Sequence, residues 1–240
     1  MPLTGTLINA GTVLVGTVVG TLVGSRLPDR IRETVMHALG LVTLILGVDQ
    51  GLEAFRPPLS ELTRGAVLIV MGSALVGGII GELIGIESGL ERAGEALKRR
   101  FGRGQARFTE GFVVASLVFC VGPLTILGSI QNGLTGDYEL LAIKSLLDGF
   151  AAMAFASALG WGVGFSVITI LVYQGGLSLL ASSVGDVFTP EVVAAMTAAG
   201  GLMIMAIGLR LLELRKIRVG NLLPALVLAP AAVALFQALR

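Results

Sequence analysis

The strongest constraint in this sequence is a succession of apolar stretches, each about 20 residues long and separated by short loops. A helix of about 20 apolar residues crosses the roughly 30 Å hydrocarbon core of a bilayer. Only 14% of the residues are charged and the mean hydropathy is +0.89, which excludes a soluble globular domain. The pattern predicts an all-α, polytopic transmembrane bundle of about eight spans. The stretches cover about 4–24, 34–52, 65–86, 108–131, 139–161, 165–184, 191–212 and 220–238.

The basic residues support this count and predict an orientation. Loops after odd-numbered stretches hold 13 of the 17 Lys and Arg residues, whereas the other loops and the tail hold Arg56, Arg64 and Arg240. Cytoplasmic loops of membrane proteins collect Lys and Arg. We therefore expect a multi-pass protein of the inner (plasma) membrane with both termini on the outer side. The count requires the glycine-rich tract at 160–164 to be a tight turn, because one helix over 139–184 would be about twice the bilayer thickness.

Several classes of protein do not fit the composition. A single Cys and a single His exclude a disulfide framework and a His/Cys metal cluster, and no cofactor motif is present. The net charge is +1 and the basic residues lie in loops, so no nucleic-acid surface is expected. The N-terminus lacks a signal-peptide pattern, so the first stretch is expected to remain as a span. The one long loop predicts an amphipathic helix over 90–101 that lies at the membrane surface, or a charged loop that only enforces topology.

A weak internal repeat links the two ends of the sequence. A shift of 161 residues brings 23–47 onto 184–208 with six identities in 25 positions. Because the repeated segments are five crossings apart, they enter the membrane from opposite sides, as in the inverted repeats of many secondary transporters. We expect one membrane domain over 1–240 with a 3+2+3 plan: repeat A at about 4–87, central spans at about 108–161 and repeat B at about 165–238. Chance similarity between two Gly-rich helices is the alternative.

Glycines spaced four residues apart mark two helix faces. Small residues at this spacing form a groove that lets two helix backbones approach closely in lipid. Spans one and three are therefore expected to pack tightly through glycine zippers, within one protomer or across a homodimer. These glycines are Gly16, Gly20, Gly24, Gly77, Gly81 and Gly85.

Lys144 and Asp148 are the residues of the fifth span whose insertion into a membrane is expected to cost the most free energy. An ionisable side chain in mid-membrane costs about 3 kcal/mol on insertion scales, so it needs a partner or a place near the headgroups. The i, i+4 spacing puts both side chains on one helix face, where they can partly neutralise each other, although Lys before Asp is the less favourable order. The alternative is a span that begins late and leaves Lys144 at the interface.

The fourth span contains a helix-breaking sequence, Cys120-Val121-Gly122-Pro123. Pro123 removes one backbone donor and displaces the carbonyl of Phe119, so a kink or break is expected. In lipid a freed carbonyl must find a partner. Either a nearby hydroxyl supplies it, Thr125 or Ser129, or the break lines a cavity and binds substrate; a kink without function is also possible.

Further polar residues in spans one, four and six complete a candidate site. If these spans converge with span five, Asn9, Thr125, Asp148 and Gln174 form a small polar chamber, although each alone is more often an interhelical hydrogen-bond partner. The candidate residues for binding a small solute or an ion are Asn9, Cys120, Gly122, Pro123, Thr125, Ser129, Gln131, Lys144, Asp148 and Gln174.

The sequence resembles a known group of bacterial membrane proteins. The segments CVGPLTILGSIQNGLTGD (120–137) and KSLLDG (144–149), with the opening GTLINAG (5–11), are similar to the uncharacterised inner-membrane proteins of the YdfK and YqgA group, filed as a domain of unknown function. The resemblance covers essentially the whole chain. It implies an integral membrane protein, described at most as a possible transport protein, and transfers no substrate and no catalytic residue.

These observations favour a small secondary transporter, coupled to an ion or a proton, or an ion-conducting protein. Asp148 is then the coupling carboxylate and the break at Gly122-Pro123 faces the solute. The partners expected are the lipid bilayer and an unidentified small solute. The alternative is a structural or partner-binding membrane protein, with its basic loop on anionic lipid or a soluble partner. An intramembrane enzyme fits least, because the two candidate Asp residues lack a GxGD motif and His37 lacks a nucleophile motif.

Overall fold

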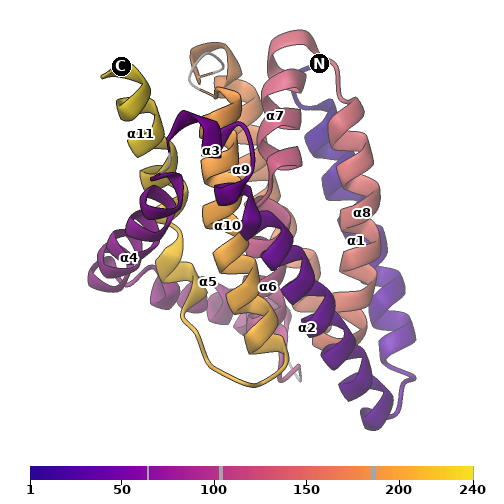
Figure 1. Ribbon diagram of the computed structural model, residues 1–240. Coiled ribbons are helices and arrows are strands. Elements are labelled where there is room, and N and C mark those ends of the chain that lie inside the picture. Colours follow the sequence, from indigo (N-terminus) through magenta and orange to yellow (C-terminus); the bar gives the residue numbers. More distant parts are fainter. Residues whose placement is uncertain (64, 103–104, 185–187, 240) are drawn as a thin grey trace. The chain divides into compact units, whose positions relative to one another are not determined.

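The computed structural model describes residues 1–240 except 64, 103–104, 185–187 and 240 (Figure 1). Arg64, Arg103, Arg240 and part of the second repeat segment therefore lie outside the described residues, as does the side chain of Pro123. The described part is all-helical, as predicted. Its elements in chain order are α1 (Thr4–Gly24), α2 (Asp29–Gly51), η1 (Leu52–Phe55), α3 (Leu59–Leu62), α4 (Ala66–Ile84), α5 (Ile86–Phe101), α6 (Phe108–Cys120), α7 (Pro123–Thr135), α8 (Glu139–Leu159), η2 (Trp161–Phe165), α9 (Ser166–Val184), α10 (Pro190–Leu211), η4 (Val219–Leu222) and α11 (Ala225–Ala238).

The helices account for the predicted spans. Among the described residues, seven helical segments are long and apolar enough to cross a membrane, and the bent pair α6 and α7 supplies an eighth if it counts as one span. Between α8 and α9 the chain forms the short 3₁₀ helix η2, preceded by Gly160 in the left-handed region at φ 80°. The glycine-rich tract is therefore the predicted turn, because only glycine adopts this conformation without steric cost.

The chain forms two compact units, each assembled from discontinuous segments. Unit 1 contains 1–39, 90–120 and 124–183, and unit 2 contains 40–89, 121–123 and 184–240. Each unit thus draws on both predicted repeats: α1 and α9 belong mainly to unit 1, whereas α4, α10 and α11 belong to unit 2. The single domain and the 3+2+3 plan stay predictions.

In unit 1 the main contact is between α1 and α8, which lie side by side (Figure 1). The glycine stripe of α1 faces the backbone of α8, because a methyl group on Gly16, Gly20 or Gly24 would overlap a carbonyl oxygen of α8. These carbonyls belong to residues 149, 153 and 157, so the two helices run parallel with a constant offset of 133 residues. The close packing of span one is therefore made within the protomer.

In unit 2 the second glycine stripe packs in the same way on other partners. A methyl group on Gly77 would meet the backbone of Ala225, and one on Gly81 would overlap the carbonyl oxygen of Asn221. The prediction that Gly85 also packs is wrong. Nothing surrounds its Cβ position, and its φ of 74° ends α4 in the left-handed conformation.

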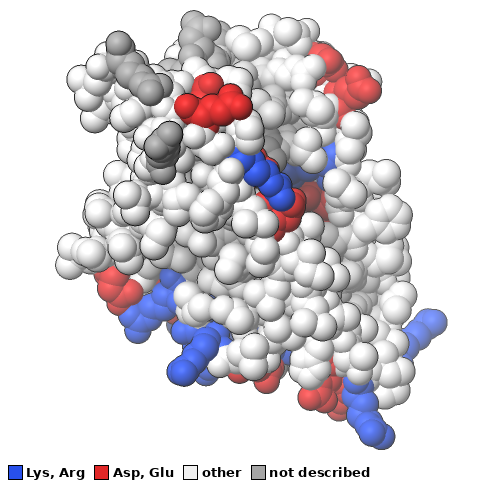
Figure 2. Space-filling model, in the orientation of Figure 1, with Lys and Arg blue, Asp and Glu red and all other residues white. Residues whose placement is uncertain are grey.

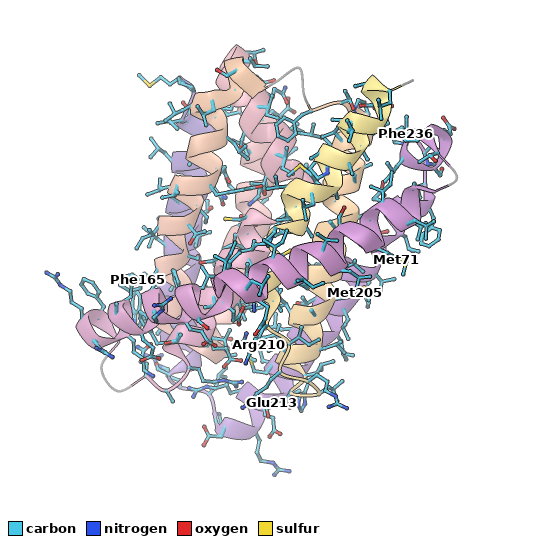
Figure 3. All side chains as sticks on the ribbon, turned by 90° about the vertical axis from the view of Figure 1, so that its left-hand side faces the viewer. Met71, Phe165, Met205, Arg210, Glu213 and Phe236 are labelled. Carbon is cyan, nitrogen blue, oxygen red and sulfur yellow. The ribbon has the colours of Figure 1, made fainter. Side chains whose placement is uncertain are left out.

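The outward faces of the helices are strongly apolar. On α4, Leu68, Leu83 and Met71 are all more than half exposed. Met71 is labelled in Figure 3. Most of the face that Figure 2 draws carries neither basic nor acidic side chains. An apolar surface of this extent is characteristic of a protein that faces lipid.

The predicted amphipathic segment at 90–101 forms the second part of α5. Its Phe101 ring packs on Phe165 with a centroid distance of 5.1 Å. On the polar side the Thr109 hydroxyl donates to Glu95 Oε1 at 2.6 Å, and this hydrogen bond lowers the pKa of the Glu95 carboxyl below its ordinary value. Its position at a membrane surface stays a prediction.

Candidate functional site

A buried ion pair lies in unit 1, in the N-terminal half of α8. Lys144 and Asp148 face each other across one turn of α8, with the ammonium bound to Asp148 Oδ2. Their exposed fractions are 6% and 9%, so the fold buries both charges, and the depth of Lys144 in the membrane stays a prediction. A pair taken out of water keeps both charges only if further polar groups surround it.

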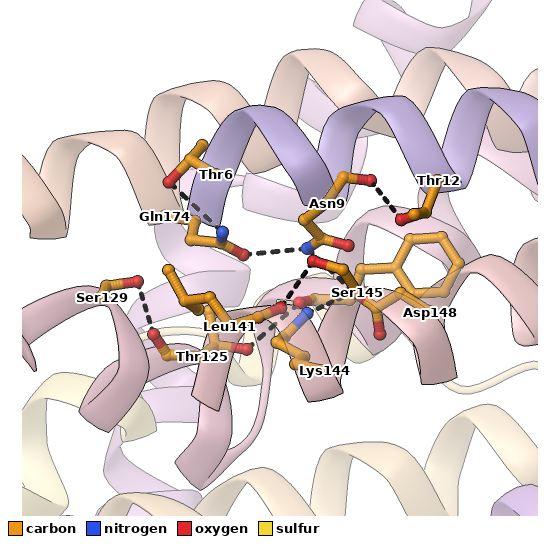
Figure 4. Close-up of polar contacts among 11 residues, drawn as sticks. Thr6, Asn9, Thr12, Thr125, Ser129, Leu141, Lys144, Ser145, Asp148 and Gln174 are labelled. Atoms are coloured by element: carbon orange, nitrogen blue, oxygen red, sulfur yellow. Dashed lines mark hydrogen bonds and ion pairs between the residues drawn. The ribbon is translucent and has the colours of Figure 1, made fainter. Parts of the chain in front are cut away.

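Side chains from two other helices supply those groups (Figure 4). Asn9 of α1 donates from Nδ2 to Asp148 Oδ2 at 3.0 Å and to Gln174 Oε1 of α9 at 2.9 Å. Gln174 in turn donates from Nε2 to Thr6 Oγ1 at 3.2 Å. Asn9 and Gln174 are completely buried. Three helices that are far apart in the sequence thus meet in one polar network, which we call the Asp148 network and define as Thr6, Asn9, Lys144, Asp148 and Gln174.

The local sequence explains why these groups meet. The glycine stripe of α1 brings its backbone against α8, which places Asn9 within hydrogen-bond distance of Asp148. On the α8 side Gly149 leaves room for Thr12, which donates from Oγ1 to the carbonyl of Asn9 at 3.0 Å. Close backbone packing and the polar network therefore depend on the same small residues.

The Asp148 network leaves oxygen atoms open. The hydrogen bonds that Asp148 receives both go to Oδ2, so within the described part of the chain Oδ1 has no donor. Asn9 Oδ1 is buried and likewise finds no hydrogen-bond partner among the described residues. A buried acceptor without a partner costs about 1–3 kcal/mol. Two open oxygens beside a carboxylate are the chemistry that binds a small cation or a proton.

The break in the fourth span is present and is satisfied internally. α6 ends at Cys120, α7 begins at Pro123, and the two helices are bent by 63°. Gly122 between them has φ 147°, which favours glycine. The Thr125 hydroxyl donates to the freed carbonyl of Phe119 at 3.3 Å. The structure thus matches the first of the two alternatives, a nearby hydroxyl as partner.

The other sequence-predicted residues lie at varying distances from the network. Thr125 is buried and bonded to Phe119, while Ser129 donates to the Thr125 carbonyl at 2.5 Å, so both stabilise α7 (Figure 4). Cys120 is a buried free thiol. Gln131 donates to Asp137 at 2.7 Å in an exposed position and is not part of the site.

One structural polar residue was missed. Asn132 is completely buried and ties α7 to the start of the chain, because its Oδ1 accepts from the Gly5 backbone at 3.3 Å. The sequence signal was available: Asn132 lies three residues after Ser129 and therefore on nearly the same helix face.

A second buried carboxylate lies in unit 2. Glu87 is only 3% exposed; its Oε1 accepts from Arg210 Nη1 at 2.8 Å and its Oε2 accepts from the Gly220 backbone at 2.6 Å. The Glu87 backbone donates to Asn221 Oδ1 at 2.7 Å. Arg210 lies near the end of α10, as Figure 3 shows. Both residues lie near the ends of their helices, and the fold pairs the two charges within unit 2.

The fold and the buried network together define a polytopic helical membrane protein with a charged pair in its interior. The chain belongs to the family described as "Protein of unknown function (DUF554)", whose model matches residues 4–234. It is 34% identical over 230 residues to "Uncharacterized protein YqgA" of Escherichia coli (strain K12), with 94% of each chain covered. It is 28% identical over 234 residues to "Uncharacterized membrane protein YdfK" of Bacillus subtilis (strain 168), covering 98% of this chain and 97% of that one. These relatives agree with the resemblance inferred from the sequence. No solved structure matches the chain significantly.

Proposed function

We propose that the protein is a small secondary transporter, or an ion-conducting protein, in which the Asp148 network binds a proton or a small cation. The observation that carries this proposal is the buried ion pair of Lys144 and Asp148, which leaves Asp148 Oδ1 without a donor among the described residues and which contacts Asn9, whose buried Oδ1 likewise has no partner. Ionisable residues inside membrane spans are costly and are characteristic of ion and proton pathways.

The geometry suggests how the network exchanges an ion. In the arrangement described, the Lys144 ammonium occupies Asp148 Oδ2 and neutralises its charge. A proton or cation that binds at Asp148 Oδ1 reduces the negative charge of the carboxylate and so weakens the hold of Asp148 on Lys144. Lys144 is then the internal counterion of the empty state, and Asp148 the coupling carboxylate.

A local symmetry in unit 2 supports the inverted repeat that this proposal favours. Gly40 lies against the Gly208 carbonyl and Gly201 lies against the Gly47 carbonyl, so α2 and α10 cross antiparallel. The 161-residue shift pairs Gly40 with Gly201 and Gly47 with Gly208. The shift therefore converts the contact between Gly40 and Gly208 into the contact between Gly201 and Gly47. This is expected for two segments related by a two-fold axis in the membrane plane.

The distribution of basic residues supports an inner-membrane location with both termini outside. The cytoplasmic ends of the spans then include the C-termini of α1 and α8. In the alternative, a protein that only binds a partner, the buried ion pair has a structural role and no flux is expected.

The test uses purified protein in proteoliposomes loaded with a pH-sensitive dye. Proton flux is measured under pH, Na⁺ and K⁺ gradients, with solutes first selected by thermal shift. We expect Asp148→Asn to reduce coupled flux at least ten-fold while the protein stays folded. Asp137→Asn is the matched control, because it makes the same chemical change at the exposed end of α7. Unchanged flux in Asp148→Asn contradicts the proposal, as does a folded wild-type protein that moves none of these ions or solutes.

A further inference from the structure

A row of unpartnered oxygens continues from the Asp148 network along α1. Thr17 Oγ1 and Thr21 Oγ1, like Asn9 Oδ1, are buried and find no hydrogen-bond partner among the described residues. Spacings of eight and four residues place the three along a stripe that winds through about 120° around α1 from Asn9 to Thr21. The row descends about 12 Å from Asn9 to Thr17 and about 6 Å further to Thr21.

The row ends in a polar pocket of unit 1. This pocket has a volume of about 360 Å³ and is lined by Thr21 together with the C-terminal ends of α1 and α8 and the loop before α6. Of its basic residues, Arg107 pairs with Glu110 at 2.8 Å. Arg32 Nη2 donates to the Gly24 carbonyl at 2.9 Å, while its buried Nε has no hydrogen-bond partner among the described residues. We call it the inner pocket.

The chemistry of the row favours water and small cations. An unsatisfied hydroxyl in an apolar interior costs about 1–3 kcal/mol, whereas contact with water or a cation removes that cost. The carbonyl ends of α1 and α8 both face the inner pocket and carry the negative ends of their helix dipoles. Acceptor oxygens thus prevail from the pocket to Thr17.

One apolar residue interrupts the row. Val13 is completely buried and lies on the same stripe, one turn from both Asn9 and Thr17. A short apolar constriction of this kind blocks a hydrated path by dewetting.

We propose that the inner pocket is the cytoplasmic entrance of a hydrated path for a small cation, the hydrated proton included. The path follows Thr21 and Thr17 and is closed toward the Asp148 network by Val13. The ion and its destination rest on the proposed function. The path itself is a statement about water access and is testable without any flux.

The experiment measures the accessibility of introduced cysteines. The native Cys120 is first replaced in a Cys120→Ala background, and Thr21→Cys, Thr17→Cys and Val13→Cys are added one at a time. Val18→Cys is the matched control, because Val18 neighbours Thr17 but lies on the exposed apolar face of α1. A membrane-impermeant, positively charged methanethiosulfonate reagent is applied to inside-out and to right-side-out vesicles.

We expect Thr21→Cys and Thr17→Cys to react from the cytoplasmic side at least ten-fold faster than Val18→Cys and Val13→Cys. The inference is overturned if Thr17→Cys reacts no faster than Val18→Cys, or if it reacts only from the outer side. Should Thr17→Cys fail to fold, radiolytic labelling of the unmodified protein in ¹⁸O-water replaces it. Label at Thr17 above that at Val18 supports the path, and equal labelling overturns it.

The two proposals fail separately. A reactive Thr17→Cys together with normal flux in Asp148→Asn leaves the path standing and removes the proposed coupling role. An unreactive Thr17→Cys together with lost flux in Asp148→Asn removes the path and leaves the proposed coupling role of Asp148 standing.

Discussion

Each unit buries a carboxylate in an ion pair, and the two carboxylates differ in how their hydrogen bonds are distributed. In unit 2 Glu87 accepts one hydrogen bond on each oxygen, from Arg210 and from the Gly220 backbone. In unit 1 both donors converge on one oxygen of Asp148, and the amide oxygen of Asn9 finds no partner among the described residues. Both carboxylates therefore accept two hydrogen bonds, but that of Asp148 keeps one oxygen to which no described residue donates.

This difference supports the proposed binding role of Asp148 and a structural role for Glu87. Glu87 joins α5 to η4 and α10 through three contacts that engage its backbone N–H and both of its carboxylate oxygens. Burial and charge alone do not distinguish the two sites, because both carboxylates are nearly inaccessible. The distribution of hydrogen bonds over the two oxygens does.

The largest expected effect comes from changing each carboxylate to its amide. Glu87→Gln turns one acceptor into a donor that faces either Arg210 or the Gly220 N–H, so we expect a loss of about 3 kcal/mol in the free energy of unfolding. Asp148→Asn keeps an acceptor for both donors but leaves the Lys144 ammonium buried without its counter-charge, so a loss of about 3 kcal/mol is expected there as well. Unfolding by denaturant in detergent micelles measures both, and a negligible loss in either variant would contradict the burial of that ion pair.

Intermediate effects are expected at the glycine stripes, which test whether both units depend on the same close packing. Gly20→Ala in unit 1 and Gly81→Ala in unit 2 each force a methyl group onto a facing carbonyl oxygen, so each is expected to cost about 1–3 kcal/mol. Gly11→Ala and Gly72→Ala are the controls, because nothing lies near their Cβ positions. The controls are expected to be neutral or stabilising by up to about 1 kcal/mol. A loss of stability in Gly11→Ala as large as in Gly20→Ala, or in Gly72→Ala as large as in Gly81→Ala, would contradict the packing described.

The smallest effect sets the scale for an ordinary polar contact. The hydroxyls of Ser116 and Thr169 are 2.9 Å apart and join α6 to α9 in unit 1. Ser116→Ala is expected to cost about 0.6 kcal/mol, the average of an interhelical hydrogen bond in membrane proteins. The same unfolding assay measures it, and a loss as large as that of Glu87→Gln would remove the distinction between neutral and charged contacts.

Sequence reasoning predicted the helices well because span length, the glycine turn at Gly160 and the helix break at Gly122 are local properties. It also considered a chamber of Asn9, Thr125, Asp148 and Gln174 on the condition that their spans converge. Asn9 contacts Asp148 and Gln174, whereas Thr125 bonds to the Phe119 carbonyl. It did not predict the Glu87 and Arg210 pair, because 123 residues separate the two side chains and each is also acceptable at an interface. The environment of Gly85 was missed for a related reason: spacing identifies a small-residue stripe but not where its helix ends.

The parallel register of α1 and α8 has a mechanical consequence. At three successive turns a glycine of α1 rests on a carbonyl of α8, so neither helix can slide or roll past the other without a steric clash. The backbones that carry Asn9 and Asp148 are therefore held in a fixed register. Gln174 is carried by α9, outside this pair, so under the proposed function a backbone rearrangement of the network is expected to involve α9 rather than a shift between α1 and α8.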